Sequence, residues 1–361
     1  MKKNKEFLIF LSAVQFVKGA NRSLVCDIQR GTLQHIPNDL YDFYKKWNRS
    51  SLEEIYEKNP DDIKVIKEYI AFLIEREYAF IGSEKDLDLF IFDSLPNKYN
   101  YPGNISNAVF EFSQKTEPFF EKFVGQLDLL QCKAIQIVAY NTPVLPENIL
   151  ELIKIINNLN SITNVEFVVP YSIQYTIENV NDLLRTNLRI DKIIVHSCPF
   201  ESIKDYQNGS IFIFTQEILN SNLCCGVISQ DYFSLNVLQF QESSSFNSCL
   251  NKKISIDGEG KIKNCPSMKN TYGDIFHDSI LEISQSKEFI KYWGLNKDMV
   301  ETCKVCEYRY VCTDCRAYIE EPNNILSKPL KCGYNPFTNE WKDWTQNPLK
   351  KTAINYYGFN K

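Results

Sequence analysis

The sequence predicts an α/β protein built from three successive parts. The first eighty residues read as strands followed by helices, the middle alternates strands with helices, and the last third is rich in cysteine. Alternation of strands and helices is typical of βαβ units with a largely parallel sheet. We assign residues 1–84, 85–240 and 241–345 to the three parts, and residues 346–361 to a C-terminal tail.

Three strands are expected in the first part. Residues 7–13 and 23–28 are strand-like, and in the second segment alternate side chains place an apolar set on one face. A turn at Gly31 leads into a third strand over residues 32–36.

Three helices are expected to follow these strands. Asn38 is placed to cap the first helix, and Ser51 and Glu54 form a capping-box pattern at the start of the second. The third helix covers about residues 62–77, and Gly82 lies just past its end as a stop signal.

The middle part reads as a βα series after a poorly patterned connection over residues 85–101. The expected strands and helices alternate along residues 107–112, 116–130, 134–139, 147–159, 165–169, 177–184 and 192–196. Two short runs, residues 211–214 and 226–229, are candidates to extend the series. The crossovers of such a series are expected to be right-handed. A partial barrel and a small open doubly wound sheet both agree with this pattern.

Seven cysteines of the last part have the spacing of metal ligands. Two C-x-x-C pairs fall within thirteen residues, one cysteine follows them and two precede them: Cys303, Cys306, Cys312, Cys315, Cys332, Cys249 and Cys265. Disulfides are not expected in a chain of 361 residues with no secretion signal. Thiolates at this density suit iron–sulfur clusters or zinc.

The cysteine pattern resembles the SPASM domain, the C-terminal cluster-binding module of many radical-SAM peptide-modifying enzymes. The family pattern runs Cys, Gly-x4-Cys, C-x2-C-x5-C-x3-C and Cys, and Gly260-x4-Cys265 matches its second part. One spacing departs, because two residues rather than three separate Cys312 from Cys315. The run CEYRYVCTDCRAY is similar to grasp-with-SPASM systems, which pair such a protein with an ATP-grasp ligase.

The resemblance implies two groups of ligands. The outer cluster would take Cys303, Cys306, Cys312 and Cys332, and the inner cluster Cys249, Cys265 and Cys315. Some relatives supply a fourth inner ligand just upstream of the first, where residues 242–248 contain no cysteine; Cys224 and Cys225 are the nearest candidates, and neither matches the family position. One or two [4Fe-4S] clusters are therefore implied, with an open inner iron or a lost inner cluster as variants. Zinc and metal-free thiols are the alternatives.

The order of strands and helices in the first part is winged-helix-like and resembles the RiPP recognition element. That domain holds the leader of a ribosomal precursor peptide as an added strand, against its third strand and beside its third helix. The positions implied here are Thr32, Leu33, Gln34, His35, Ile36, Ile63, Ile66 and Ile70. An exposed sheet edge supplies main-chain partners for such a peptide, and side-chain pockets supply selectivity. The alternative is a winged helix without a peptide ligand.

The middle part resembles the partial (β/α) barrel of radical-SAM enzymes in a degenerate form. The family holds its catalytic cluster with C-x3-C-x2-C after the first strand, whereas residues 113–118 contain no cysteine. Of the family's Gly-Gly-Glu-Pro segment, only Pro143 has a counterpart. Without these thiolates no iron is available for SAM, so SAM binding and cleavage are not expected.

Charge and hydropathy argue against nucleic-acid and membrane partners. A net charge of −5 without a basic run argues against nucleic acid, and the apolar residues 7–17 are too few to span a bilayer. We therefore expect a cytoplasmic protein without a membrane partner. The resemblance implies graspetide-type RiPP maturation: the chain binds a precursor leader, carries auxiliary clusters and acts with an ATP-grasp ligase. An iron–sulfur redox enzyme acting on the bound peptide and a structural zinc-binding adaptor are the alternatives, and no catalytic residue is assigned.

Overall fold

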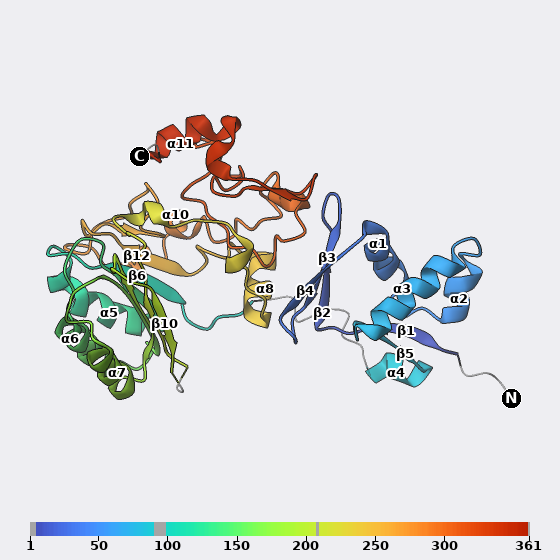
Figure 1. Ribbon diagram of the computed structural model, residues 1–361, viewed down its shortest axis with the longest axis horizontal. Helices are drawn as coiled ribbons and strands as arrows, with labels where there is room; N and C mark the ends of the chain where they lie inside the picture. Colours follow the sequence, from blue (N-terminus) through green and yellow to red (C-terminus); the bar gives the residue numbers. More distant parts are fainter. Residues whose placement is uncertain (1–4, 90–98, 207–208, 360–361) are drawn as a thin grey trace.

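The computed structural model describes residues 5–89, 99–206 and 209–359. The N-terminal part lies at one end of the molecule, a large sheet with its helices lies at the other, and the cysteine-rich part lies between and above them (Figure 1). The expected connection over residues 85–101 begins as a short helix, Glu84–Leu89, and its stretch 90–98 lies outside the described residues.

The N-terminal part contains two small antiparallel sheets. Its elements are β1 (Phe7–Phe10), β2 (Val14–Val17), β3 (Ser23–Asp27), β4 (Thr32–Ile36), α1 (Asn38–Trp47), α2 (Leu52–Glu57), α3 (Ile63–Glu75), β5 (Ala79–Gly82) and α4 (Glu84–Leu89). One sheet has the order β2-β3-β4, and β1 pairs with β5 in the other. The expectation of three strands was wrong. The first strand ends at Phe10, a further strand follows at Val14–Val17, and Gly82 is the last residue of β5 rather than a stop signal after a helix. The residue that follows α3 and its C-cap is Glu77, in the left-handed region at φ 55°.

Of the two helix N-caps that the sequence predicts, the structure has one. Ser51 caps α2 by accepting a hydrogen bond from the backbone N–H of Glu54 at 3.2 Å. Asn38 does not cap α1, because Pro37 occupies the cap position. The Asn38 side chain instead accepts a hydrogen bond from Ser23 Oγ at 2.6 Å, which ties the first turn of α1 to β3.

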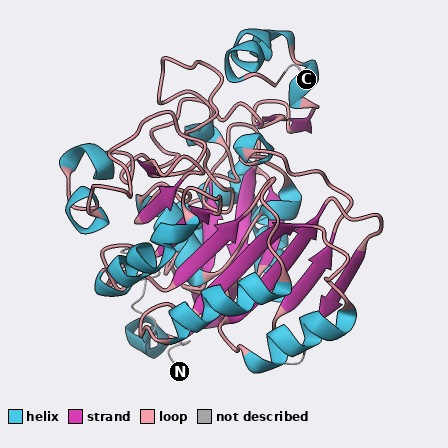
Figure 2. Ribbon diagram, turned by 90° about the vertical axis from the view of Figure 1, so that its left-hand side faces the viewer, coloured by secondary structure: helices cyan, strands magenta, loops and turns pink. Residues whose placement is uncertain are grey.

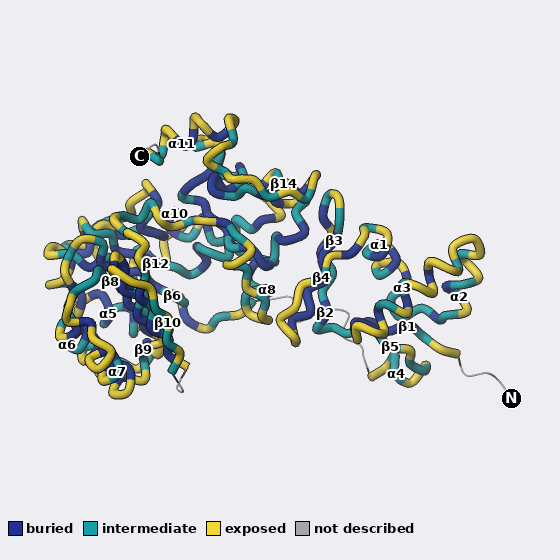
Figure 3. The backbone as a smooth tube through the Cα atoms, in the orientation of Figure 1, coloured by how far each residue is buried: buried dark blue, intermediate teal, exposed yellow. Residues whose placement is uncertain are grey.

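Strand β3 is buried along its whole length, on both faces (Figure 3). Val25 packs into the core of the N-terminal part with residues of α1 and α3. The alternate side chains Leu24 and Cys26 pack with Tyr308 and Val311 of the cysteine-rich part. The alternation read from the sequence therefore marks a face that is covered by a distant segment of the chain.

The large sheet has eight strands. Its elements are β6 (Asn107–Glu111), α5 (Phe120–Leu129), β7 (Ala134–Val138), α6 (Pro146–Asn157), β8 (Asn164–Pro170), α7 (Ile177–Thr186), β9 (Ile190–His196), β10 (Ser202–Asp205), β11 (Ile211–Phe214), β12 (Lys253–Ile256) and β13 (Ile262–Lys263). The order is β10-β11-β9-β8-β7-β6-β12-β13, and only β10 and β13, at the two edges, are antiparallel to their neighbours.

Strands β6, β7, β8 and β9 are neighbours in chain order, and α5, α6 and α7, which connect them, lie on one face of the sheet (Figure 1 and Figure 2). A doubly wound sheet would reverse its strand order and carry helices on both faces. Large side chains such as Phe110, Phe123 and Phe167 fill the space under the helices. On the opposite face Val109, Val138 and others form a small apolar cluster.

The cysteine-rich part contains little regular structure. Its elements are α8 (Val237–Ser245), α9 (Ile280–Ile283), α10 (Lys287–Ile290), β14 (Tyr334–Asn335), β15 (Glu340–Trp341) and, in the tail, α11 (Lys351–Tyr357). Residues 226–229 do not form a strand, and only Ile228 makes an isolated bridge, with Cys332. No helix in the ranges that the structure describes is long and apolar enough to cross a membrane.

Candidate functional site

Eight of the twelve cysteines line two separate cavities in the cysteine-rich part. The inner cavity, of about 260 Å³, is lined by Cys225, Cys249, Cys265 and Cys315. The outer cavity, of about 20 Å³, is lined by Cys303, Cys306, Cys312 and Cys332. All of these side chains are free thiols. The structure thus brings the seven candidate ligands together as three and four, and it adds Cys225 to the inner group.

A buried polar network joins two of the inner cysteine turns. The side-chain oxygen of Asn247 accepts a hydrogen bond from the backbone N–H of Cys249 at 3.0 Å, and its amide donates to Asp314 at 2.7 Å. Asp314 also forms an ion pair with Arg316 at 2.8 Å, and both of these side chains are fully buried. Because Asp314 and Arg316 flank Cys315, the network fixes Cys249 and Cys315 relative to each other.

The outer cysteines are held by short turns and two lysines. A 3₁₀ turn, Cys303–Val305, begins the group, and the N–H of Cys306 donates to the carbonyl of Cys303 at 2.9 Å. The buried ammonium of Lys297 donates to Cys312 Sγ at 2.9 Å and to a neighbouring carbonyl. A lysine thus supplies positive charge next to the sulfur that would carry negative charge as a ligand.

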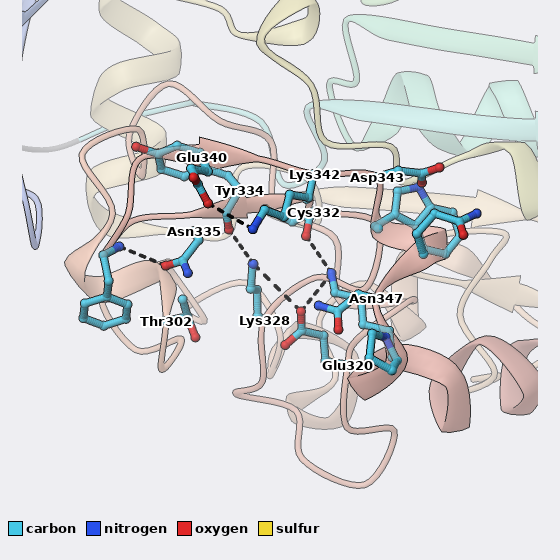
Figure 4. Close-up of a pocket in the computed structure, with 16 residues that line it drawn as sticks. Thr302, Glu320, Lys328, Cys332, Tyr334, Asn335, Glu340, Lys342, Asp343 and Asn347 are labelled. Atoms are coloured by element: carbon cyan, nitrogen blue, oxygen red, sulfur yellow. Dashed lines mark hydrogen bonds and ion pairs between the residues drawn. The ribbon is translucent and has the colours of Figure 1, made fainter.

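A second lysine binds the backbone of the outer cysteine Cys332. Lys350, from the tail, donates to the carbonyl of Cys332 at 2.6 Å and pairs with Glu320 at 2.9 Å. All three residues line a pocket of about 770 Å³, in which Figure 4 labels Cys332 and Glu320. Only 3% of Lys350 is exposed. The tail therefore belongs structurally to the cysteine-rich part, and its lysine fixes the backbone that presents Cys332.

Burial raises the proton affinity of two of the thiols, Cys303 and Cys315. Burial raises the pKa of Cys303 to about 12, although the positive charge of Lys297 opposes the shift. Burial also raises the pKa of Cys315 to about 12, and the neighbouring Cys249 raises it further. Metal binding would therefore release protons from these thiols, since the thiolate is the ligand.

The two cavities differ in what they could hold. The inner cavity is large enough for a group of several atoms surrounded by four sulfurs, as a [4Fe-4S] cluster is. The outer cavity has room for about one water molecule, which needs roughly 10–15 Å³, so a cluster there would require the cysteine turns to move outward. Within the described ranges, no three His, Cys, Asp or Glu side chains are arranged to hold a single metal ion.

The candidate peptide-binding strand has an open edge. Among the residues that the structure describes, β4 pairs with β3 alone. Thr32, Leu33 and His35 are exposed, whereas Gln34 is half-buried and Ile36 is buried. The candidate peptide-binding residues of α3 are not all at the surface. Ile63 is half-buried, while Ile66 and Ile70 lie in the core of the N-terminal part. The structure therefore brings the strand residues to an open edge and does not bring Ile66 or Ile70 there.

Hydrogen bonds connect this N-terminal part to the outer cysteines. His35 Nε2 lies 2.7 Å from the hydroxyl of Tyr308, and Arg22 donates to Glu307 at 2.8 Å and to the same hydroxyl at 3.0 Å. The N–H of Ala20 donates to the carbonyl of Val305 at 2.8 Å. Sequence reasoning missed these contacts, because no local pattern pairs residues almost three hundred positions apart.

The carboxyl ends of β6 and β7 border a pocket of about 190 Å³, and none of its lining residues is a cysteine. The chain leaves β6 in a tight turn, in which the N–H of Ser113 donates to Thr116 Oγ1 at 2.9 Å. The same threonine hydroxyl donates to the carbonyl of Glu111 at 2.8 Å. Residues 113–118 thus form a compact polar turn directly after β6, at the border of this pocket.

No family model matches the chain, and no curated protein matches it. Crystal structures of Streptococcus suis SuiB are similar to it at low identity. The complex with S-adenosylmethionine gives a TM-score of 0.34 at 10% identity, over 90% of this chain and 99% of that chain. The complex with the precursor peptide SuiA gives 0.31 at 11% identity, over 86% and 96%. A third SuiB structure gives 0.33 at 12% identity, over 89% and 98%.

Proposed function

We propose that this chain is a maturation protein for a ribosomal peptide of the graspetide type. It binds the leader of a precursor on the edge of β4 and carries metal on the thiols of its cysteine-rich part. An ATP-grasp ligase acts on the peptide that this chain presents. The observation that carries the proposal is the open strand β4 beside the thiol module, joined to it through His35 and Tyr308.

The peptide would add to β4 as a further antiparallel or parallel strand. The free backbone groups of an edge strand provide such a partner with hydrogen bonds, and neighbouring side chains select its sequence. Leu33 is an exposed apolar side chain on this strand, with 37% of its surface accessible. A free leader is disordered, so binding must offset its ordering entropy, and micromolar affinity is the expected order of magnitude.

The reaction itself is assigned to the partner. The sequence contains neither a glycine-rich phosphate loop nor a Walker lysine, so activation by ATP requires another protein. The chain also lacks the C-x3-C-x2-C motif, so cleavage of SAM is not part of the proposed activity. When bound, an iron–sulfur cluster would supply redox chemistry or a structural crosslink at the inner thiols.

Calorimetry with the full-length chain and a synthetic leader, taken from the precursor encoded beside it, tests the peptide role. Proline is introduced in two variants, Leu33→Pro and Gln34→Pro. Neighbouring N–H groups of a strand point to opposite sides, so one variant removes an edge donor and the other removes a bond to β3. We expect the variant that removes the edge donor to lose leader binding while its folding is unchanged. The variant that removes a bond to β3 should lose stability. Full binding by both variants, or no binding by the folded parent, contradicts the proposal.

The metal content separates this proposal from the zinc adaptor. Protein purified without oxygen is expected to be brown and to contain iron and acid-labile sulfide. Stoichiometric zinc without sulfide would instead support a structural zinc-binding role. Leader binding is measured on the same preparation, so the peptide role and the metal role are judged separately.

A further inference from the structure

We propose that Cys225 is the fourth ligand of the inner site, which four protein thiolates then close. The inference rests on the proposed metal-binding role of the cysteine-rich part. It identifies a ligand that the cysteine spacing does not reveal, because Cys225 precedes Cys249 by twenty-four residues. It also decides between an open and a closed inner site.

The first observation is the shared cavity. Cys225 lines the same cavity of about 260 Å³ as Cys249, Cys265 and Cys315, and no other cysteine of the described chain lines it. The Cys225 side chain therefore borders the same space as the other three inner thiols.

The second observation is the backbone at Gly226. This glycine is in the left-handed region at φ 81°, and a Cβ atom built on it would lie 2.8 Å from Cys315 Sγ. Any other residue would push into the sulfur, so the absence of a side chain lets the chain pass directly over Cys315. The close approach places the preceding Cys225 at the cavity wall.

The third observation is that this loop is fixed in place. The N–H of Cys225 donates to the carbonyl of Asn222 at 3.1 Å, and Lys331 donates to the Cys225 carbonyl at 2.8 Å. Three residues later, Ile228 forms a bridge with Cys332 of the outer group. The loop is thus held between the two groups of thiols, which fixes the backbone of Cys225 at the inner cavity.

The neighbouring Cys224 provides a matched control within the same loop. Its Sγ donates to the carbonyl of Ser221 at 3.1 Å, and it does not line the inner cavity. Both cysteines are exposed by surface area, so exposure alone does not distinguish them. Of the two neighbours, only Cys225 lines the inner cavity with the other three thiols.

A closed site has a definite chemical consequence. Four thiolates satisfy all four irons of a [4Fe-4S] cluster, so no iron is left for a substrate group. The inner group then transfers electrons or stabilises the fold, and it does not bind the peptide directly.

The test uses full-length protein, loaded with iron and sulfide without oxygen, as parent, Cys225→Ala, Cys225→Ser and Cys224→Ala. Iron and sulfide are measured per chain, and electron paramagnetic resonance spectra of the reduced proteins are recorded with and without added imidazole. We expect both Cys225 variants to lose the iron of one cluster, or to acquire a spectrum that imidazole changes. The parent and Cys224→Ala should do neither.

Equal iron and equal insensitivity to imidazole in all four proteins would overturn the inference while leaving the proposed function intact. A parent that takes up no iron would overturn both the inference and the metal role. Circular dichroism and leader binding establish that each variant is folded, so a loss of iron is not mistaken for unfolding. Loss of leader binding in every protein, with a normal inner cluster, would contradict the peptide role alone.

Discussion

Replacing Asp314 by alanine should strongly destabilise the cysteine-rich part. Its carboxylate accepts from Arg316 at 2.8 Å and from Asn247 at 2.7 Å, and neither side chain of the ion pair is more than 1% exposed. Removing the carboxylate leaves a buried guanidinium without its counter-charge, which costs about 3–5 kcal/mol. With a slope of roughly 2 kcal/mol per molar urea, the unfolding midpoint falls by about 2 M.

Urea unfolding followed by tryptophan fluorescence measures this effect, because Trp293, Trp341 and Trp344 all lie in the last part of the chain. A loss below about 1 kcal/mol would refute the reasoning, since it would mean that the pair is solvated or dispensable. The double variant Asp314→Leu/Arg316→Met removes both charges and should lose less than the single variant.

As a surface control, Glu340→Ala removes a pair whose two side chains are 56% and 77% exposed, so its stability should change by less than about 0.5 kcal/mol. Parent and variants are compared at equal iron content, because metal binding is itself coupled to folding. A large effect of Glu340→Ala would show that the assay does not report specifically on buried charge.

Three further predictions concern titration, the tail and SAM. Burial raises the pKa of Glu242 to about 7, although a hydrogen bond from Asn251 opposes the shift. The native state therefore binds more protons than the unfolded chain between about pH 4.5 and 7, so stability should fall as pH rises through this window. Glu242→Gln should remove this pH dependence when urea unfolding is measured from pH 5 to 8. Lys350→Met deletes the donor to the Cys332 carbonyl and should lower stability by about 1–3 kcal/mol in the same assay, whereas an unchanged midpoint would contradict the supporting role of the tail. Reduced protein incubated with SAM should form no 5′-deoxyadenosine by liquid chromatography, and peptide-dependent formation would contradict the expectation that this chain does not cleave SAM.

The sequence predicts local elements well where the pattern is local. Strands β4 and β11 occur at the expected boundaries, because a turn or a short apolar run delimits each of them. The βα series was found because continuous apolar strands alternate with amphipathic helices. Pairings between distant segments left no such pattern, so the partnership of β1 with β5 and the place of β12 beside β6 were missed.

The candidate site shows the same division. Spacing alone identified seven thiols, because C-x-x-C turns are local. The position of Cys225 depends on how a loop folds over Cys315, which spacing does not encode. An apolar stripe on a helix predicts that these side chains are buried, but it does not predict which partner covers them. On α3 the side chains of Ile66 and Ile70 pack in the core of the N-terminal part.

The contact between the N-terminal part and the thiol module has a mechanical consequence for peptide presentation. Strand β3 buries one face in its own domain and the other against Tyr308 and Val311, so the small sheet cannot rotate without exposing apolar surface to water. Tyr308 lies between Cys306 and Cys312 in the chain and contacts His35 on β4. A peptide strand on the open edge of β4 would therefore be held at a fixed distance from the outer thiols. Such a rigid connection agrees with the proposed role of positioning a peptide for a separate ligase, because the ligase would then meet the peptide in one orientation.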